Sequence, residues 1–174
     1  MANREALREL QNRLAAKLQA AKTEARAPGW LAVESGGHGF LLPLAEAGEI
    51  FGVASLIPVP HTSRWFLGVA NLRGGLHGVV DLAGFLGLRA LTDGTRDGAQ
   101  LVAFNPVFDI NCALLVDRLA GLRSAEQVQA EEADEGAPRP IFAGTLYRDA
   151  AGRRWQELKL AGLAREERFL RIIG

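Results

Sequence analysis

Residues able to perform acid–base or metal chemistry are few and widely spaced in this chain. Its three histidines, His38, His61 and His77, lie 23 and 16 residues apart, whereas metal ligands on one helix or strand are much closer in sequence. The sequence has no phosphate-binding loop ending in Lys and Ser or Thr, no H-E-x-x-H and no G-x-S-x-G motif. Cys112, the single cysteine, lies in the apolar run C-A-L-L-V, which predicts a buried, unreactive thiol. We therefore predict no catalytic residue, no metal site and no cofactor.

One cation and one anion stand inside an apolar segment at residues 65–88 that is repeatedly broken by glycine. Arg73 and Asp81 must each be paired or presented to a partner, because isolated charges in apolar surroundings are costly. Glycines such as Gly68 and Gly74 indicate tight turns or close approaches of the backbone. The pattern predicts strands shaped around a contact surface.

The composition is that of a globular domain and argues against several classes of partner and location. The chain has 174 residues, 48% of them hydrophobic, which is enough for one packed domain. Its 20 basic and 20 acidic residues give a formal net charge of zero, which argues against nucleic acid or an anionic membrane as partner. A single cysteine allows no internal disulfide and fits a reducing cytoplasm. Because no signal peptide or long apolar run is found, we expect neither export nor membrane insertion.

An amphipathic helix is predicted at residues 4–26, which contain no glycine or proline. Pro28 and Gly29 are expected to end it. Its apolar face is formed by Leu7, Leu10, Leu14, Leu18, Ala21 and Ala25. Two interpretations are open, a cap on the body of the fold or a helix that binds a partner. We favour the cap, because such stripes usually face a core.

Beyond residue 30 the chain consists of short apolar runs separated by turn residues, at intervals typical of small β-barrels or sandwiches. One helical turn is expected at 82–88 and a second short helix at 162–169. Ten strands are predicted, at residues 30–33, 39–43, 49–54, 66–72, 76–82, 100–105, 112–116, 121–124, 141–147 and 154–160. The predicted fold class is therefore mainly β with an N-terminal helix.

Two polar stretches, residues 89–99 and 125–140, are predicted to be connectors, because their charge and turn residues leave little to bury. The second is expected to be a solvated loop rather than a docking site for a basic partner. Its acidic residues are Glu126, Glu131, Glu132, Asp134 and Glu135. The first is expected to divide two groups of about five strands that share an interface, since each group alone would be marginally stable.

Several short motifs resemble, in order and spacing, the signature of the CheW-like coupling proteins of bacterial chemosensory systems. They are F-L-G-V-A-N-L-R-G at 66–74, V-V-D-L at 79–82 and F-L-G-L at 85–88. Gly-Glu-Ile at 48–50, Pro-Val-Pro at 58–60 and Leu-Val-Asp at 115–117 resemble further family motifs. The likeness covers about residues 30–174. Residues 83–87, the N-terminal helix and the closing segment 163–170 most resemble the branch that serves type IV pilus twitching motility.

The resemblance implies two small five-stranded, SH3-like β-barrels packed side by side in a CheW-like domain at 29–174, preceded by the helix at 1–28. It also implies a non-enzymatic adaptor that joins the cytoplasmic tip of a chemoreceptor to the regulatory domain of a CheA-type histidine kinase. Such an adaptor is cytoplasmic and is held at the inner face of the membrane through receptor arrays. In the family, a groove between the barrels receives the receptor's helical hairpin, and an edge of one barrel pairs with the kinase's related domain.

Arg73 matches the arginine of the family's N-L-R-G motif and Glu49 its acidic partner, so the resemblance implies that the two lie together at an interface. The alternative is a purely structural ion pair that fixes strand register. Val53, Val69 and Leu72 are candidates for an apolar groove lining, although such residues more often pack in a core.

Five further motif residues are predicted to be structural, because glycines permit tight turns and short polar side chains hold turns and backbone amides. They are Gly68, Asn71, Gly74, Asp81 and Asp117. The alternative function is a small-molecule-binding or sensory β-barrel module that acts outside a receptor array. An enzyme would need converging titratable groups, and the sequence offers no recognisable set.

Overall fold

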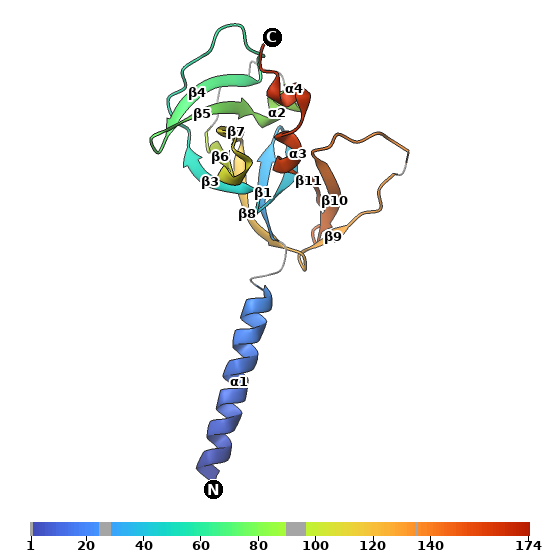
Figure 1. Cartoon of the computed structure of the whole chain (residues 1–174). Coiled ribbons are helices and arrows are strands. Elements are labelled where there is room, and N and C mark those ends of the chain that lie inside the picture. Colours follow the sequence, from blue (N-terminus) through green and yellow to red (C-terminus); the bar gives the residue numbers. More distant parts are fainter. Residues whose placement is uncertain (1, 25–28, 90–96, 135) are drawn as a thin grey trace.

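The computed structural model describes residues 2–24, 29–89, 97–134 and 136–174. A long N-terminal helix precedes a body made mainly of strands, and short helices end the chain (Figure 1). The elements are α1 (Ala2–Glu24), β1 (Gly29–Ser35), β2 (His38–Pro43), β3 (Ala47–Gly52), β4 (Phe66–Leu72), β5 (Gly75–Asp81), α2 (Leu82–Phe85), β6 (Gln100–Phe104), the 3-10 turn η1 (Pro106–Phe108), β7 (Cys112–Val116), β8 (Arg118–Ser124), β9 (Val128–Ala130), β10 (Ala143–Asp149), β11 (Arg154–Leu158), α3 (Leu160–Leu163) and α4 (Glu167–Leu170).

The strands form two sheets. One has six strands in the order β8-β1-β2-β11-β10-β9, and the other has five in the order β3-β6-β7-β5-β4. We call them the six-stranded and the five-stranded sheet. The pairs β2–β11 and β5–β7 are parallel, and the other pairs are antiparallel. The chain thus starts one sheet, builds the whole of the other, and returns to complete the first.

The predicted division of the strands at residues 89–99 is wrong. β5 and β6 stand on either side of that stretch, yet both belong to the five-stranded sheet, where β7 pairs with each of them. The sheets are separated instead between β2 and β3 and between β7 and β8. Because β7 follows β6 by a short connection, it completes this sheet before the chain leaves it. Residues 90–96 of the predicted connector lie outside the described residues.

Strand alternation explains how the two sheets share a core. Successive side chains of a strand point to opposite faces. In β7, Cys112, Leu114 and Val116 belong to a large cluster shared by both sheets, whereas Ala113 and Leu115 belong to a cluster inside the five-stranded sheet. β1 does the same for the six-stranded sheet. Strands that are buried on both faces have continuous apolar sequences. The predicted architecture of two packed β-units is confirmed.

Rings fill the centre of the shared core. Phe85 makes edge contacts with Trp65 and Phe169, whose ring centroids lie 5.1 and 5.3 Å away. Phe104 stacks on Phe169 at 5.8 Å. Phe169 lies on α4, so burial of its ring holds the C-terminal segment against both sheets. Such ring pairs add about 0.5–1.5 kcal/mol each beyond the area that they bury.

Most predicted strands are present with ends shifted by a few residues, and those at 66–72 and 112–116 match at both ends. The short strand β9, which lies in the predicted loop 125–140, was not predicted. Val128 on this strand is buried and packs beside Trp30 and Trp155, but three residues are too short to show alternation. The single helix predicted at 162–169 is two short helices, α3 and α4, and the turn at 82–88 contains α2.

The same loop is not uniformly solvated. The Glu131 side chain is only 19% exposed, and its Oε1 lies 2.6 Å from the Arg148 guanidinium. That ion pair joins the end of β9 to β10. Glu135 lies outside the described residues.

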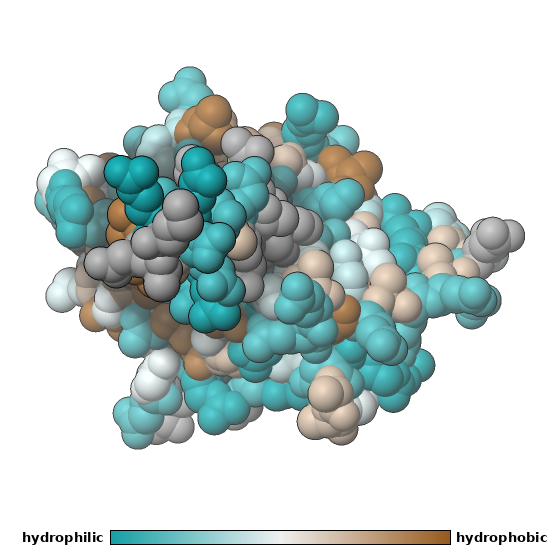
Figure 2. Space-filling view, turned by 90° about the horizontal axis from the view of Figure 1, so that it is seen from below, coloured by the Kyte–Doolittle hydropathy of each residue, from teal (hydrophilic) through white to brown (hydrophobic). Residues whose placement is uncertain are grey.

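The N-terminal helix is present, but the cap interpretation is wrong. α1 projects away from the sheets (Figure 1), and the side chains of Leu7, Leu10, Leu14 and Leu18 are 53 to 64% exposed. None of the three core clusters of described residues includes a residue of α1. Seen from the end at which α1 projects, the coloured surface is mainly hydrophilic, with hydrophobic residues in small separate patches (Figure 2). The body thus completes its core without the helix.

Candidate functional site

The arginine singled out in the sequence lies at the tip of the hairpin between β4 and β5. Arg73 and Gly74 form the two-residue turn, both with positive φ, at 48° and 77°. Two-residue hairpin turns of this kind need positive φ at both central positions, which suits Gly74 and costs Arg73 on the order of 1 kcal/mol. Asn71 Oδ1 accepts a hydrogen bond from the Gly74 amide at 3.0 Å. The turn therefore holds a strained arginine at a fixed point of the surface.

Arg73 and Glu49 form an ion pair. The Arg73 guanidinium lies 2.5 Å from Glu49 Oε1, and their side chains are 77% and 42% exposed. Glu49 lies on β3 and Arg73 follows β4, the two edge strands of the five-stranded sheet. A contact between opposite edges requires the sheet to curl back on itself, as a barrel does. The pair is nonetheless open to solvent, and its charges remain accessible to a partner.

The three apolar candidates differ in exposure. Val53 is 51% exposed just after β3, and Val69 is half-buried on β4. Leu72 is only 4% exposed and belongs to the cluster inside the five-stranded sheet, so its assignment to a groove lining is wrong. Leu72 is the last residue of β4, and its side chain points into the interior of the five-stranded sheet.

Gly68 permits a close backbone contact beside this edge. Its φ is 129°, and a Cβ at this position would lie 2.2 Å from the Ile57 carbonyl oxygen. Ile57 and Val69 exchange two backbone hydrogen bonds of 2.8 and 2.9 Å, which cover this part of β4. Ile57 thus covers part of the β4 edge, whereas β3, at the other edge, pairs only with β6 among the described strands.

A second ion cluster lies deeper in the molecule. Arg89 donates hydrogen bonds to both carboxylate oxygens of Asp81 and, at 2.6 Å, to Asp117 Oδ1. Asp81 is 1% exposed, and Arg89 is 15% exposed. Burial alone lowers the pKa of Arg89, but the hydrogen bonds and charges of Asp81 and Asp117 outweigh it and raise that pKa above its ordinary value. The guanidinium is therefore held charged between two carboxylates.

Asp117 also joins the two sheets. Its Oδ2 accepts a hydrogen bond from the Gly36 amide at 2.8 Å, in the turn between β1 and β2. This agrees with the prediction that Asp117 holds a backbone amide. Asp81 differs, because it precedes α2 without a side-chain cap bond and pairs with Arg89 instead. Arg89 itself was missed, since it was assigned to the start of a polar connector.

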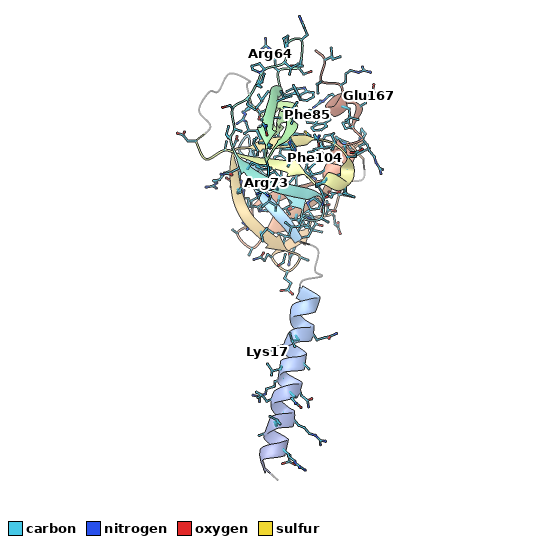
Figure 3. All side chains as sticks on the ribbon, turned by 60° about the vertical axis from the view of Figure 1, so that its left-hand side comes forward. Lys17, Arg64, Arg73, Phe85, Phe104 and Glu167 are labelled. Carbon is cyan, nitrogen blue, oxygen red and sulfur yellow. The ribbon has the colours of Figure 1, made fainter. Side chains whose placement is uncertain are left out.

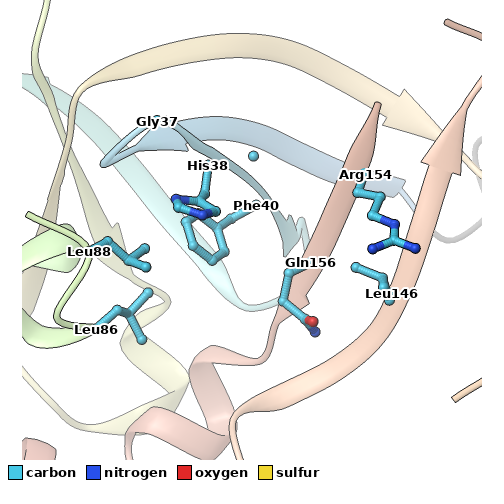
Figure 4. A pocket seen from close by; sticks show the side chains of 9 residues that line it. Gly37, His38, Phe40, Leu86, Leu88, Leu146, Arg154 and Gln156 are labelled. Atoms are coloured by element: carbon cyan, nitrogen blue, oxygen red, sulfur yellow. The ribbon is translucent and has the colours of Figure 1, made fainter. Parts of the chain in front are cut away.

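An apolar groove of about 490 Å³ lies between the six-stranded sheet and the segment that follows α2. One wall is Leu86 and Leu88, in the segment after α2, and they face His38 and Phe40 of β2 (Figure 4). Leu146, Arg154 and Gln156 of β10 and β11 complete it. The hydrogen bonds of Arg89 and Asp117 hold the two walls of the groove together. Arg89 directly follows Leu88 on one wall, and Asp117 binds the Gly36 amide, next to β2 on the other. The groove thus has a mainly hydrophobic floor and a polar rim.

None of Val53, Val69 and Leu72 lines this groove. Its lining comes from segments that are distant in sequence, so no local pattern marked His38, Leu146 or Gln156. The only signal was F-L-G-L at 85–88, which contributes Leu86 and Leu88. The Arg73–Glu49 pair and the groove are therefore two separate surfaces.

Groups that could bind metal or react as nucleophiles do not gather at either surface. No cluster of three or more His, Cys, Asp or Glu able to hold a metal ion is found among the described residues. Cys112 is buried as expected, and its burial raises the pKa of the thiol to about 12. No helix in the described part of the chain is long and apolar enough to cross a membrane.

Comparison with protein families decides the identity. The model of the CheW-like domain matches residues 29–168, more than half of the chain. The chain belongs to the CheW-like family. The start of the match at residue 29 coincides with the start of β1.

This CheW-like chain is similar to Protein PilI of Pseudomonas aeruginosa, with 30% identity over 166 residues that cover 92% of the chain and 88% of PilI. The likeness predicted from the sequence, to the twitching-motility branch of the family, is thereby confirmed. The fold is similar to the crystal structure of the scaffolding protein TtCheW from Thermoanaerobacter tengcongensis, with a TM-score of 0.64 at 14% identity, covering 76% of this chain and 89% of that protein. In this CheW-like chain the N-L-R-G motif forms the β4–β5 turn, and V-V-D-L supplies the buried Asp81.

Proposed function

We propose that this protein is a non-enzymatic adaptor that joins the cytoplasmic tip of a chemoreceptor to the regulatory domain of a CheA-type histidine kinase. Membership of the CheW-like family makes a scaffold role the general expectation. Similarity to Protein PilI supports a pathway that controls type IV pilus twitching motility. The adaptor works in the cytoplasm and reaches the membrane only through the receptor array.

The observation that carries this proposal is the presence of two different contact surfaces on one small body. The groove of about 490 Å³ between the six-stranded sheet and the segment after α2 is mainly hydrophobic, which suits the apolar face of a helix. The second surface is the exposed Arg73–Glu49 pair beside the edge strand β3. We assign the groove to the receptor's helical hairpin and the Arg73–Glu49 surface to the kinase.

Exposed apolar side chains support the second assignment. Ile50 and Val53 on and after β3 are 39% and 51% exposed, and Leu76 on β5 is 60% exposed. They accompany Arg73 and Glu49 on the strands of the same sheet. Aliphatic side chains beside one accessible ion pair provide both area and orientation for a protein contact.

Charge reversal tests whether the pair is an interface or only a structural link. Binding of the purified protein to the kinase regulatory domain and to the receptor tip of the same organism would be measured by calorimetry. Arg73→Glu should weaken kinase binding by about tenfold or more, while the melting temperature changes little. The double variant Arg73→Glu with Glu49→Arg restores the pair in reversed order. If the double variant keeps the wild-type melting temperature but does not regain kinase binding, the pair acts at the interface.

A groove variant provides the matched control. Leu146→Glu places a charge in the groove and should weaken receptor-tip binding by about tenfold while leaving kinase binding unchanged. Arg73→Glu should show the opposite pattern. If neither variant alters either affinity, or the protein binds neither partner, the adaptor proposal is wrong.

A small-molecule-binding module is the second candidate, and the size of the groove favours it. A volume of about 490 Å³ falls within the range of ligand pockets. Native mass spectrometry of protein purified from its own cells tests this function. A stoichiometric bound metabolite that Leu146→Glu removes would favour the module over the adaptor.

A further inference from the structure

We propose that α1 is a docking helix, whose row of exposed leucines binds an apolar helix edged by acidic residues on a partner protein. The row consists of Leu7, Leu10, Leu14 and Leu18, and we call it the leucine stripe. Each of its side chains is more than half exposed, at 53 to 64%. Figure 3 shows α1 extending away from the sheets, with the Lys17 side chain labelled. The stripe is thus a continuous apolar surface that the body does not cover.

The shape of the stripe favours a helix as its partner. Successive residues of a helix turn by about 100°, so spacings of three, four and four place the four leucines within an arc of about 80°. Such a narrow seam is typical of paired helices, whereas a helix lying on a core or at a lipid interface has a wider apolar face. The 23 residues of α1 include no aromatic side chain, which interfacial helices commonly carry.

The charges beside the stripe favour an acidic partner. By the same rotation, Lys17 is the nearest charged residue on one side of the stripe and Arg4 the nearest on the other. Within residues 4–19, Arg13 and Arg8 follow them, one on each side. Glu5 lies on the opposite face of the helix, and Glu9 is turned toward that face, where its carboxylate is 3.7 Å from Arg13. Cations therefore border the apolar seam along both edges over residues 4–19.

The same arrangement argues against a second copy of this chain. In a pair of α1 helices, the edge with Lys17 and Arg13 would face either the edge with Arg4 and Arg8 or its own counterpart. Both orientations bring like charges together, and edge charges set partner choice in paired helices. An apolar helix with glutamate or aspartate along its edges would place opposite charges there instead.

The test uses the full-length protein and two synthetic helical peptides, each of four heptads with leucine at the seam positions. One peptide carries glutamate at the edge positions and the other carries lysine. Calorimetry should detect binding of the glutamate peptide and none of the lysine peptide. This test involves neither the kinase nor the receptor tip, so it can fail independently of the proposed adaptor function.

Two variants with the same added group locate the contact. Leu14→Asp places a carboxylate in the leucine stripe and should weaken binding of the glutamate peptide by about tenfold or more. Asn12→Asp places it on the far side of the helix and should leave binding almost unchanged. Circular dichroism checks that both variants keep the helix.

Four outcomes would overturn the proposal. The first is equal binding of the two peptides, and the second is no binding of either. The third is a concentration-dependent dimer, seen by light scattering, that Leu14→Asp abolishes, because the stripe would then bind a second copy. The fourth is sedimentation of the protein with phosphatidylglycerol vesicles, lost in Leu14→Asp, without peptide binding, because the stripe would then bind a membrane.

Discussion

At the scale of single residues, two ion pairs of nearly equal length have different energetic worth because they differ in exposure. The Arg73–Glu49 distance is 2.5 Å and the Arg89–Asp81 distance is 2.6 Å. Solvent surrounds the first pair, and such pairs stabilise a fold by about 0–1 kcal/mol. Asp81 is 1% exposed, so loss of its guanidinium would leave a buried carboxylate without that partner. Arg73 is thus available for binding, whereas Arg89 supports the fold and the groove.

Arg89→Met should therefore lower the free energy of unfolding by about 3–5 kcal/mol, whereas Arg73→Met should lower it by less than about 1 kcal/mol. Urea denaturation monitored by circular dichroism measures both. Adding Asp81→Asn to Arg89→Met should recover part of the loss, because it removes the buried charge. Equal losses in the two single variants, or a further loss on adding Asp81→Asn, would contradict this account.

Among site residues, those with local causes could be predicted from the sequence. Asn71 and Gly74 belong to a turn whose signal lies within four consecutive residues. The pairing of Arg73 with Glu49 followed from the family resemblance. The groove could not be predicted, because Leu88, His38 and Gln156 meet only after the two sheets have packed. Arg89 was missed for a related reason. Its two acidic partners lie 8 and 28 residues away, and no periodic pattern connects them.

At the scale of elements, the sequence predicted the strands and helices whose positions depend on local apolar patterns and turn residues. Both ends of β7 were predicted, because the polar residues Asn111 and Asp117 border its continuous apolar run, and β4 ends where Arg73 and Gly74 form a turn. β9 was missed, since its burial depends on Trp30 and Trp155 rather than on its own three residues. Periodicity showed that α1 is a helix, but it could not show whether the body offers a surface to cover the leucines.

Removal of residues 1–26 should leave the melting temperature of the body within about 2 °C of the full-length value, because the leucine stripe contributes no residue to the core clusters described. Differential scanning calorimetry of the two proteins at equal concentration measures the difference. A control deletion of residues 167–174 removes Phe169 from the shared core and should lower the melting temperature clearly. A comparable drop for the N-terminal deletion would revive the cap interpretation.

At the scale of the whole molecule, the order of strands makes the two sheets mutually dependent. β1 and β2 begin the six-stranded sheet, but its remaining strands arrive only after the five-stranded sheet is complete. Strand spacing predicted two groups of about five strands, and the structure has sheets of six and five. Which strands belong to each sheet depends on long-range pairing that no local pattern encodes. The groove lies between β2, β10 and β11 of the six-stranded sheet and the segment after α2, so its shape depends on how that segment packs on the sheet.

Three carboxylates of the six-stranded sheet and its turns make the stability of the molecule depend on pH. The hydrogen bond from Arg153 is the main reason that the pKa of Glu34 lies below its ordinary value, with Arg118 adding to the effect. The pKa of Glu131 is lowered chiefly by Arg148, and that of Asp149 by the hydrogen bond from Trp155. A lowered folded-state pKa means that the unfolded chain binds protons first as pH falls. The stabilisation is therefore present above the ordinary pKa values, near 4, and is lost as pH falls through the folded ones.

Urea titrations from about pH 6 to about pH 3 should accordingly show a falling free energy of unfolding, and Glu34→Gln should make that fall shallower. The arginines that hold Glu34 provide graded controls. Arg153→Gln should flatten the pH dependence more than Arg118→Gln, because the Arg153 hydrogen bond is the larger cause of the lowered pKa. All three variants can lower stability at neutral pH, so the slope against pH, rather than the level, is the deciding quantity. If Glu34→Gln leaves the slope of unfolding free energy against pH unchanged, acid unfolding is governed by carboxylates other than Glu34.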